Sequence, residues 1–267
     1  MDKLIITTVQ TDLHWENKAA NLEMLGAKIM GIKEKTNIVV LPEMFSTGFT
    51  MQPELLAEKM DGETIAWMRN IAREKGIILA GSLSIEEDGE YYNRFIWMLP
   101  SGQHGTYDKR HCFSLGGENE HYAPGNKRTI ASVGGWRINL QICYDLRFPV
   151  WARQQPFADP EKEPAPEYDL MINVANWPER RSHHWKTLLQ ARAIENQCFV
   201  VGVNRVGNDG NGLYHSGDSM VIDPLGQVLY HKSKEEDVHT TILEKSQLDE
   251  VRTRLPFWKD GDHFLLV

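Results

Sequence analysis

The sequence contains few cysteines, no long hydrophobic run and no recognisable secretion signal. Its 267 residues include three cysteines, Cys112, Cys143 and Cys198, an odd number without a CxxC spacing, so no disulfide framework is implied. No stretch approaches the roughly 20 apolar residues that a membrane helix needs. The first residues lack the basic start, long apolar stretch and small-residue cleavage site of a secretory signal. We therefore expect a soluble protein of the reducing cytoplasm.

Basic residues are also in the minority. Lys and Arg number 29 against 37 Asp and Glu, which gives a formal net charge of -8. An acidic chain without a basic stripe argues against nucleic acid or an anionic membrane as the main partner. It does not exclude an anionic small molecule, because a local arginine can hold one inside an acidic protein.

No linker divides the chain. With 41% hydrophobic and 25% charged residues, the composition is that of a globular protein long enough to bury a large core. The one Pro- and Glu-rich segment, "FADPEKEPAPEYD" at residues 157–169, is closely flanked by strand-like runs on both sides, so we interpret it as a surface loop. We predict a single domain over residues 1–267.

Runs of apolar and β-branched residues alternate with amphipathic stretches. The runs predict strands, which fall at residues 4–13, 37–44, 135–146, 168–177 and 198–207. Apolar residues at helical spacing, with charges between them, predict helices at residues 15–35, 61–76, 183–197 and about 244–254. We expect the helix at 61–76 to have Asp61 as its N-cap and Gly76 as its stop.

Hairpins interrupt this alternation. Residues 77–102 predict two strands joined at an Asp88-Gly89 turn. Residues 218–231 and 238–244 predict hairpin strands around the turn at residues 224–226. Strands alternating with helices, with hairpins interleaved, predict a layered α/β fold in which helices cover the sheets.

Three of the predicted strands end in a polar residue. Glu43 follows "IVVLP", Cys143 follows "INLQI" and Asn176 follows "MINVA". Strand ends in such folds face the crevice where ligands bind. Most buried cysteines are merely small hydrophobic residues, but this placement favours a functional interpretation of Cys143.

A catalytic cysteine needs a base or a cation beside it, because a thiol with its usual pKa of about 8.5 is mostly protonated at pH 7. Glu43 is costly to bury unless it is paired or used. Lys109 would favour a thiolate and stabilise a developing oxyanion. Glu118 is a second carboxylate that could divide acid, base and orienting roles with Glu43, and spacing alone does not choose between Glu118 and its neighbour Glu120.

Three segments together resemble the signature segments of the nitrilase superfamily. They are "LPEMFSTGF", "YDKRHCFSLGGENEHYAPG" and "WRINLQICYDLRFPVWAR", and the likeness extends to "NVANWPERRSHHW", "ARAIENQCFVVGVNRVG" and "GDSMVIDPLG". The chain is most similar to the omega-amidase branch, whose members hydrolyse ω-amides of 2-oxo acids. One departure is Cys112, which stands where members more often carry an apolar residue.

The resemblance implies a four-layer αββα sandwich and a Glu-Lys-Cys triad made of Glu43, Lys109 and Cys143. It implies that Glu43 is the proton acceptor and donor, that Lys109 and the backbone N–H of Tyr144 hold the oxyanion, and that Glu118 assists. It also implies a thioester intermediate, no metal and no organic cofactor, a small-molecule amide as partner, and homo-oligomers built from dimers. The apolar end "LPFWKDGDHFLLV" at residues 255–267 suits either a subunit contact or docking onto its own fold.

From this branch we predict hydrolysis of 2-oxoglutaramate or 2-oxosuccinamate to the 2-oxo diacid and ammonia. A substrate carboxylate requires a cation near the pocket. Arg147 is our choice, with Arg180 and Arg181 as further candidates that also suit surface salt bridges. We expect Phe45 and Trp177 to form walls of the site, although aromatic residues near strand ends are as often part of the core.

Other interpretations remain open at the level of the sequence. The superfamily also contains aliphatic amidases, nitrilases and carbamoyl-amide hydrolases. A Cys-His hydrolase would take its base from one of four histidines, His111, His183, His184 and His215. A zinc site would combine His111, Cys112, Glu118 and His121, a spacing that matches no familiar ligand pattern. A non-catalytic relative that binds a metabolite or a protein is the remaining alternative.

Overall fold

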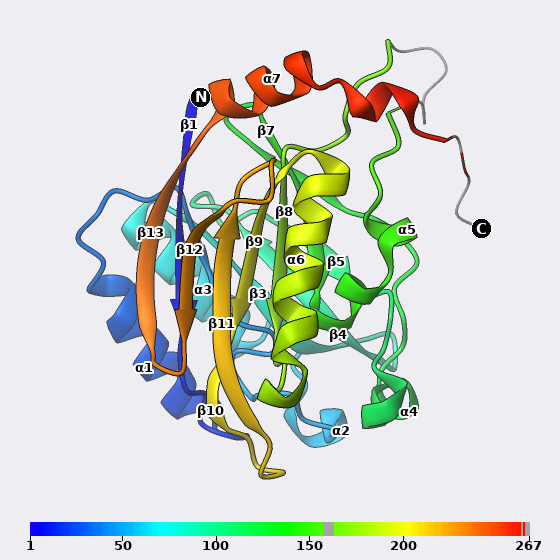
Figure 1. Cartoon of the computed structure of the whole chain (residues 1–267). Helices are drawn as coiled ribbons and strands as arrows, with labels where there is room; N and C mark the ends of the chain where they lie inside the picture. The colour runs from blue at the N-terminus through cyan, green and yellow to red at the C-terminus, as the bar shows by residue number, and fades with distance from the viewer. Residues whose placement is uncertain (157–162, 263, 265–267) are drawn as a thin grey trace.

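Two β-sheets pack face to face and helices cover their outer faces (Figure 1). The structure is a computed structural model, and it describes residues 1–156, 163–262 and 264. Within these residues, no helix is both long and apolar enough to cross a membrane.

The first sheet has six strands in the order β13-β1-β2-β3-β4-β5. The strands β1, β2 and β3 are parallel, and the remaining neighbours pair antiparallel. Their bounds are β1 (Lys3–Gln10), β2 (Ile38–Val40), β3 (Ile78–Glu87), β4 (Glu90–Met98), β5 (His104–Asp108) and β13 (Asp237–Glu244).

The second sheet has seven strands, in the order β10-β11-β9-β8-β7-β6 with β12 also paired to β11. Its centre, β7-β8-β9, is again parallel. The bounds are β6 (Ile130–Val133), β7 (Trp136–Ile142), β8 (Leu170–Ala175), β9 (Phe199–Asn204), β10 (Val206–Asn208), β11 (Tyr214–Ile222) and β12 (Val228–Ser233).

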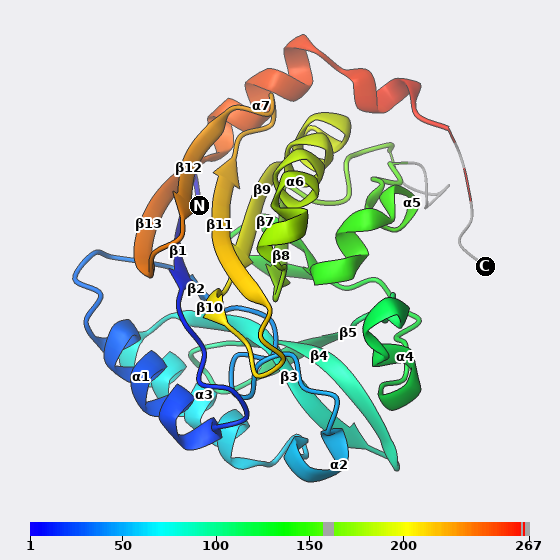
Figure 2. The same ribbon diagram turned by 60° about the horizontal axis from the view of Figure 1, so that its bottom comes forward.

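Helices complete four layers. Figure 2 shows α1 and α3 on the outer side of the first sheet and α5 and α6 on the outer side of the second. The helices are α1 (Lys18–Met30), α2 (Pro53–Leu56), α3 (Glu63–Lys75), α4 (Glu118–His121), α5 (Pro149–Ala152), α6 (Ser182–Asn196) and α7 (Lys245–Arg254). The predicted αββα sandwich is confirmed.

Side-chain alternation along the central strands builds three apolar layers. In β2, Ile38 and Val40 join the core between the two sheets, whereas Val39 packs with α1 and α3. In β8, Ile172 enters the core between the sheets and Met171 packs beneath α6. The continuous apolar runs in the sequence therefore mark strands that are buried on both faces.

The helix α3 begins one residue later than predicted. Its N-cap is Gly62 and not Asp61, and the carboxylate of Glu58 accepts the backbone N–H of Thr64 in the first turn at 2.8 Å. A side chain at position 62 would collide with Glu58, since its Cβ would lie 2.5 Å from the Oε2 atom of that glutamate. The predicted stop at Gly76 is confirmed, with this glycine in the left-handed conformation at φ 65°.

The hairpin predicted near the C-terminus is partly wrong. The turn at residues 224–226 joins β11 to β12. The segment 238–244, however, forms most of β13, which leaves this hairpin and pairs antiparallel with β1 in the first sheet. The predicted turn at Asp88-Gly89 does join β3 to β4, and both residues have positive φ.

The Pro- and Glu-rich segment forms no helix or strand over residues 163–169, as expected for a loop. Residues 157–162 of that prediction lie outside the described residues. Of the C-terminal segment, residues 257–260 form a 3₁₀ turn on which Phe257 is 61% exposed.

Asp169 holds α7 across one end of the sandwich, where Figure 1 shows it. The Asp169 carboxylate is 1% exposed and contacts Arg137 at 2.9 Å, Arg252 at 2.9 Å and Lys245 at 2.7 Å. Burial by itself would raise the pKa of Asp169, but hydrogen bonds from Arg137 and Lys245 outweigh burial and lower the pKa to about 2.

We predict that Asp169→Asn lowers the free energy of unfolding by about 3 kcal/mol, because it leaves three cations without their buried counter-charge. The folded-state pKa lies below the unfolded value, so the carboxylate stabilises the fold above about pH 4 and this contribution is lost as the pH falls toward 2. Urea unfolding should therefore show a difference between wild type and variant that is largest near neutral pH and shrinks on acidification. Glu250→Gln serves as the control, because it removes an exposed carboxylate from α7, the helix that Asp169 holds. It should leave the urea midpoint of unfolding unchanged.

Candidate active site

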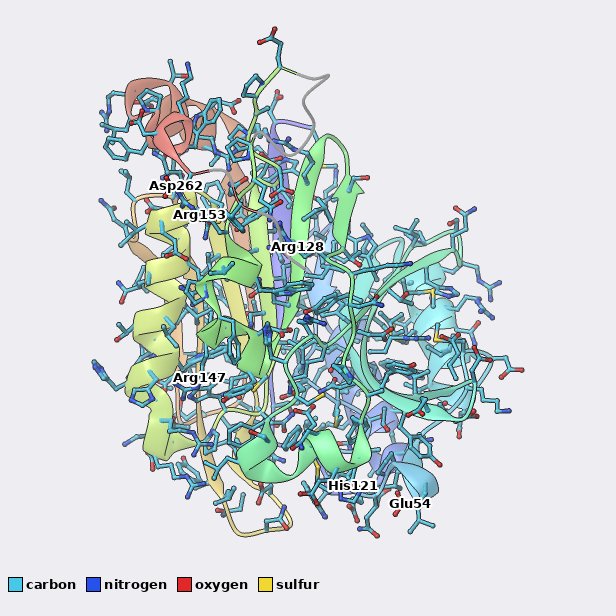
Figure 3. All side chains as sticks on the ribbon, turned by 90° about the vertical axis from the view of Figure 1, so that its right-hand side faces the viewer. Glu54, His121, Arg128, Arg147, Arg153 and Asp262 are labelled. Carbon is cyan, nitrogen blue, oxygen red and sulfur yellow. The ribbon has the colours of Figure 1, made fainter. Side chains whose placement is uncertain are left out.

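The ends of strands from both sheets bring the candidate residues together. Glu43 lies three residues beyond β2, Lys109 directly follows β5, and Cys143 directly follows β7. The strand β7 runs parallel to β8, and the backbone N–H of Asn176, just beyond β8, donates to Glu43 of the first sheet at 2.8 Å. The carboxyl ends of strands from both sheets therefore meet at the site. Figure 3 shows Arg147, from the turn after Cys143, beside α6 and below Arg153.

Cys143 occupies a sharp turn. It opens the 3₁₀ helix Cys143–Arg147 with a φ of 42°, a left-handed conformation that costs energy for a residue with a side chain. The turn leaves the side chain partly exposed at the end of an otherwise buried strand. A nucleophile on a strained strand-to-helix turn is held out of the sheet toward a ligand.

Asp145 ties this turn to the rest of the fold. Its carboxylate is fully buried and accepts hydrogen bonds from the hydroxyl of Tyr107 at 2.7 Å, from the backbone N–H of Ile142 at 3.1 Å and from that of His111 at 3.0 Å. The ring nitrogen Nδ1 of His111 lies a further 2.8 Å from the same carboxylate. These contacts offset the strain at Cys143.

The Lys109 ammonium lies between two buried carboxylates. Its Nζ donates to Oε1 of Glu43 at 2.9 Å and to both carboxylate oxygens of Glu118, at 2.9 and 2.8 Å. All three side chains are at most 1% exposed. Glu120, the alternative, is exposed to solvent on α4, so Glu118 is the carboxylate that reaches Lys109.

Two asparagines complete the contacts around Glu43. The side chain of Asn93 donates to Oε1 of Glu43 at 2.8 Å and to Oε1 of Glu118 at 3.1 Å. The backbone N–H of Asn176 donates to the other oxygen, Oε2 of Glu43, at 2.8 Å. The carboxylate of Glu43 is thereby fixed in one orientation.

The charges in this cluster perturb one another. Burial alone would lower the pKa of the Lys109 ammonium, but the charges of Glu118 and Glu43 outweigh it and raise this pKa well above its usual value. Burial raises the pKa of Glu118 despite the opposing charge of Lys109. Burial, the negative charge of Glu43 and a hydrogen bond to Glu43 raise the pKa of the Cys143 thiol well above its usual value. In the resting site the sulfur is therefore a thiol beside a carboxylate.

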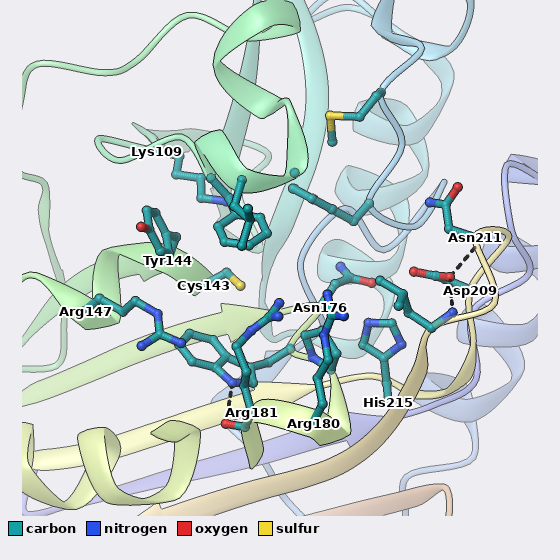
Figure 4. Close-up of a pocket in the computed structure, with 18 residues that line it drawn as sticks. Lys109, Cys143, Tyr144, Arg147, Asn176, Arg180, Arg181, Asp209, Asn211 and His215 are labelled. Atoms are coloured by element: carbon teal, nitrogen blue, oxygen red, sulfur yellow. Dashed lines mark hydrogen bonds between the residues drawn. The ribbon is translucent and has the colours of Figure 1, made fainter. Parts of the chain in front are cut away.

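A pocket of about 360 Å³ opens onto the sulfur of Cys143 (Figure 4). Lys109 and Tyr144 line it beside the cysteine, and Trp177 and Asn176 line it at the end of β8. The pocket is large enough for a small amide, since ligand pockets begin at roughly 300 Å³.

Arginines cover one wall of the pocket. Arg147, Arg180 and Arg181 all line it (Figure 4). The guanidinium of Arg147 lies over the ring of Trp177, 4.7 Å from its centroid, and Nη2 lies 3.2 Å from Nδ1 of His184.

Phe45, predicted as a wall of the site, is instead part of the core. It is 0% exposed, packs beneath α3 with its ring 5.9 Å from that of Trp67, and does not line the pocket. Met44 has a φ of 43°, so the chain turns sharply after Glu43 and directs the next aromatic side chain into the apolar layer. Trp177, the other predicted aromatic residue, does line the pocket.

The surroundings of the four candidate histidines disfavour a Cys-His pair with Cys143. His111 is engaged by Asp145, and His183 and His184 are exposed on α6. His215 lines the pocket, but burial and the charge of Arg205 lower its pKa to about 4, which makes it a weak base.

The residues proposed for a zinc site are not brought together. His121 is exposed, and Glu118 is committed to Lys109. No group of three or more His, Cys, Asp or Glu side chains in the described part of the chain has metal-binding geometry.

Sequence reasoning missed Asn93 and Asp145. Asn93 is a buried polar residue inside β4, and Asp145 is a carboxylate within two residues of the cysteine. A polar side chain among the apolar residues of a strand was the available signal for Asn93. Its two carboxylate partners lie 50 and 25 positions away in the chain, which no local pattern indicates.

Comparison with known proteins is consistent with this geometry. The sequence matches the family model of the carbon-nitrogen hydrolases over residues 5–253. The chain belongs to the carbon-nitrogen hydrolase family, as the resemblance to the nitrilase superfamily predicted. It is 41% identical to omega-amidase YafV of Escherichia coli (strain K12) over 100% of both chains. It is 30% identical to 2-oxoglutaramate amidase of Bacillus subtilis (strain 168), over 97% of each.

Solved structures agree in fold. One is XC1258 of Xanthomonas campestris, a CN-hydrolase superfamily protein with an arsenic adduct in its active site. It is 44% identical to this chain and superposes with a TM-score of 0.97 over 100% of both chains. Nit3 of Saccharomyces cerevisiae, a member of branch 10 of the nitrilase superfamily, has a TM-score of 0.84 at 24% identity, over 96% of this chain and 95% of its own. The protein is thus an enzyme of the carbon-nitrogen hydrolase class.

We predict that Glu43→Gln speeds alkylation of Cys143 by iodoacetamide at pH 7.5. The substitution removes a negative charge that raises the pKa of the thiol, and each unit of pKa lowering increases the thiolate about tenfold while the thiol form dominates. Peptide mapping by mass spectrometry separates Cys143 from Cys112 and Cys198. The exposed Glu120→Gln is the matched control and should alkylate at the wild-type rate. Slower alkylation in Glu43→Gln would show that the loss of Glu43 as proton acceptor outweighs the effect of its charge on the pKa of the thiol.

Proposed function

We propose that the protein is an amidase that hydrolyses the terminal amide of a small 2-oxo acid, with Glu43, Lys109 and Cys143 as its catalytic triad. The contact set around the sulfur carries this proposal: a thiol on a strained turn, a buried carboxylate beside it, and an ammonium held at 2.9 Å from that carboxylate. The names of the two relatives, omega-amidase and 2-oxoglutaramate amidase, support the substrate class.

In the first half of the reaction, the thiol of Cys143 attacks the amide carbonyl and transfers its proton to Glu43. Lys109 and the backbone N–H of Tyr144 stabilise the negative charge that develops on the carbonyl oxygen. Protonated Glu43 then donates its proton to the amide nitrogen, because an amide anion is too poor a leaving group. The C–N bond breaks, ammonia leaves, and the acyl group remains on sulfur as a thioester.

In the second half, Glu43 takes a proton from a water molecule as this water attacks the thioester. The carboxylic acid forms, the C–S bond breaks, and the proton returns to the sulfur of Cys143. Glu118 assists in both halves by holding Lys109 through two hydrogen bonds, at 2.9 and 2.8 Å. These steps balance without a metal or an organic cofactor.

Arg147, with Trp177 beneath it, is proposed to bind the substrate carboxylate. A planar guanidinium matches a carboxylate with two parallel hydrogen bonds. Stacking on the ring of Trp177 at 4.7 Å restrains the guanidinium before substrate arrives. The substrates we assign are 2-oxoglutaramate and 2-oxosuccinamate, which yield a 2-oxo diacid and ammonia.

Three further features of the proposal come from composition, for the domain and the location, and from the family resemblance, for the assembly. We assign the whole chain to one catalytic domain, located in the cytoplasm and assembled as a homo-oligomer built from dimers. Light scattering on the purified protein measures the oligomer directly.

The choice of base is tested by two variants compared in one assay. We expect Glu43→Gln to lower kcat for ammonia release from 2-oxoglutaramate by a factor on the order of 10³, since a general base contributes about 10² to 10⁴. His215→Asn should retain at least about a tenth of the activity. The reverse pattern would identify a Cys-His enzyme. If wild type releases no ammonia from either 2-oxo amide but hydrolyses aliphatic amides or nitriles, the family holds and the substrate assignment fails.

The role of Arg147 is tested by a change in KM. We expect Arg147→Gln to raise KM for 2-oxoglutaramate about tenfold or more, because a charge-assisted hydrogen-bond pair is lost, with a smaller effect on kcat. The KM of Arg147→Lys should fall between those of wild type and Arg147→Gln, since lysine keeps the charge but lacks the paired N–H donors of a guanidinium. Steady-state kinetics with ammonia detection provides both constants. An unchanged KM in Arg147→Gln would remove this residue from carboxylate binding.

A further inference from the structure

Three arginines give one wall of the pocket its positive charge. Within the residues that the structure describes, no carboxylate lies in ion-pair distance of Arg147, Arg180 or Arg181, whereas seven other arginines have such a partner. Lys109 faces the same pocket, but Glu43 and Glu118 neutralise it. The excess charge therefore belongs to the three guanidinium groups.

Arg181 is a half-buried arginine of this wall, and the charges of Arg180, Arg147 and Cys143 all act on it. Burial, followed by the charges of Arg180 and Arg147, lowers the pKa of its guanidinium, and Cys143 is among the groups that act on it. Its guanidinium lies over the ring of Phe113, 5.3 Å from the centroid, and its backbone oxygen accepts the indole N–H of Trp177 at 2.8 Å. Arg181 is thus a half-buried cation fixed at the pocket wall.

The remaining polar groups of the wall offer little to a cationic ligand. Asp209 is the one carboxylate among the described residues that line the pocket, and its Oδ1 already accepts the backbone N–H groups of Asn211 and Leu213, each at 2.9 Å. Figure 4 shows Asp209 beside Asn211, on the far side of the pocket from Arg147. His215 is 2% exposed and carries no charge at neutral pH.

We infer that Arg181 is a specificity-determining residue that repels an α-ammonium group, so that the pocket accepts the ω-amide of a 2-oxo acid and rejects the corresponding amino-acid amide. The inference rests on the proposed function. Glutamine and 2-oxoglutaramate share the amide, the methylene chain and the carboxylate, and they differ at one carbon, which carries an ammonium or an oxo group. Like charges brought together in a partly desolvated site discriminate strongly against the wrong ligand.

The test compares three substrates: 2-oxoglutaramate, glutamine, and glutaramate, which carries neither an oxo nor an ammonium group. We expect Arg181→Gln to lower the ratio of kcat/KM for 2-oxoglutaramate over glutamine about tenfold or more, which corresponds to about 1.4 kcal/mol. The kcat/KM for glutaramate should change by the same factor as that for 2-oxoglutaramate, because for both substrates the variant loses only attraction for the carboxylate.

Matched variants separate charge from shape. Arg181→Lys keeps the charge and should keep the ratio within about threefold of wild type. Arg254→Gln removes an exposed charge from α7 and should leave the ratio unchanged. Arg180→Gln removes the charge of the exposed arginine next to Arg181 and should lower the ratio by a smaller factor. This variant provides a second test if Arg181→Gln folds poorly.

Two outcomes would overturn the inference. One is an unchanged ratio of 2-oxoglutaramate over glutamine in both Arg181→Gln and Arg180→Gln. The other is a selective loss of 2-oxoglutaramate relative to glutaramate, which would mean that Arg181 binds the oxo group and does not act by repulsion. If wild type turns over neither 2-oxoglutaramate nor glutaramate, the proposed function itself fails.

Discussion

The site depends on one buried cation shared by two buried carboxylates. Lys109 lies within 2.9 Å of both Glu43 and Glu118, and none of the three is more than 1% exposed. Each charge would be costly to bury alone, so the three stabilise one another and hold one geometry. Under the proposed mechanism, the carboxylate of Glu43 accepts the proton of the thiol and the ammonium of Lys109 stabilises the oxyanion.

Both sheets of the sandwich contribute residues to this cluster. One carboxylate follows a strand of the first sheet, the cysteine follows a strand of the second, and Asn176 of the second sheet donates its backbone N–H to Glu43 of the first. The apolar core between the sheets fixes their separation, and the site inherits that rigidity. A close-packed interior has few voids, so strand ends that meet above it keep their positions.

We attribute ligand specificity to the arginine wall of the pocket, where the charges differ from those beside the sulfur. Beside the sulfur, Lys109 is paired with Glu43 and Glu118, whereas on the arginine wall no carboxylate of the described residues lies within ion-pair distance. Paired charges position reacting groups, and unpaired ones select a ligand by its sign. An acidic protein can therefore hold an anionic substrate, since the local field of a pocket and the net charge of a chain are separate quantities.

The sequence predicted most of the central strands and the long helices of the four layers, because side-chain periodicity is a local property that reports which faces are buried. It placed Glu43, Cys143 and Asn176 at strand ends, and the signature segments in their order along the chain carried the resemblance to the family. It did not predict that β13 crosses to the first sheet, that Glu58 caps α3 from outside, or that Phe45 turns into the core.

Those features were decided by the tertiary structure alone. Spacing left Glu118 and Glu120 open and the resemblance favoured Glu118, and the structure brings Glu118 to Lys109 and leaves Glu120 exposed. Each depends on contacts between residues far apart in the chain, such as the 133 positions that separate Asn176 from Glu43. The sequence by itself determined which chemical groups are present and which strand or loop each belongs to. Only the packing of the two sheets decided which of them meet, because burial makes unpaired charges costly and leaves room for one arrangement that pairs them.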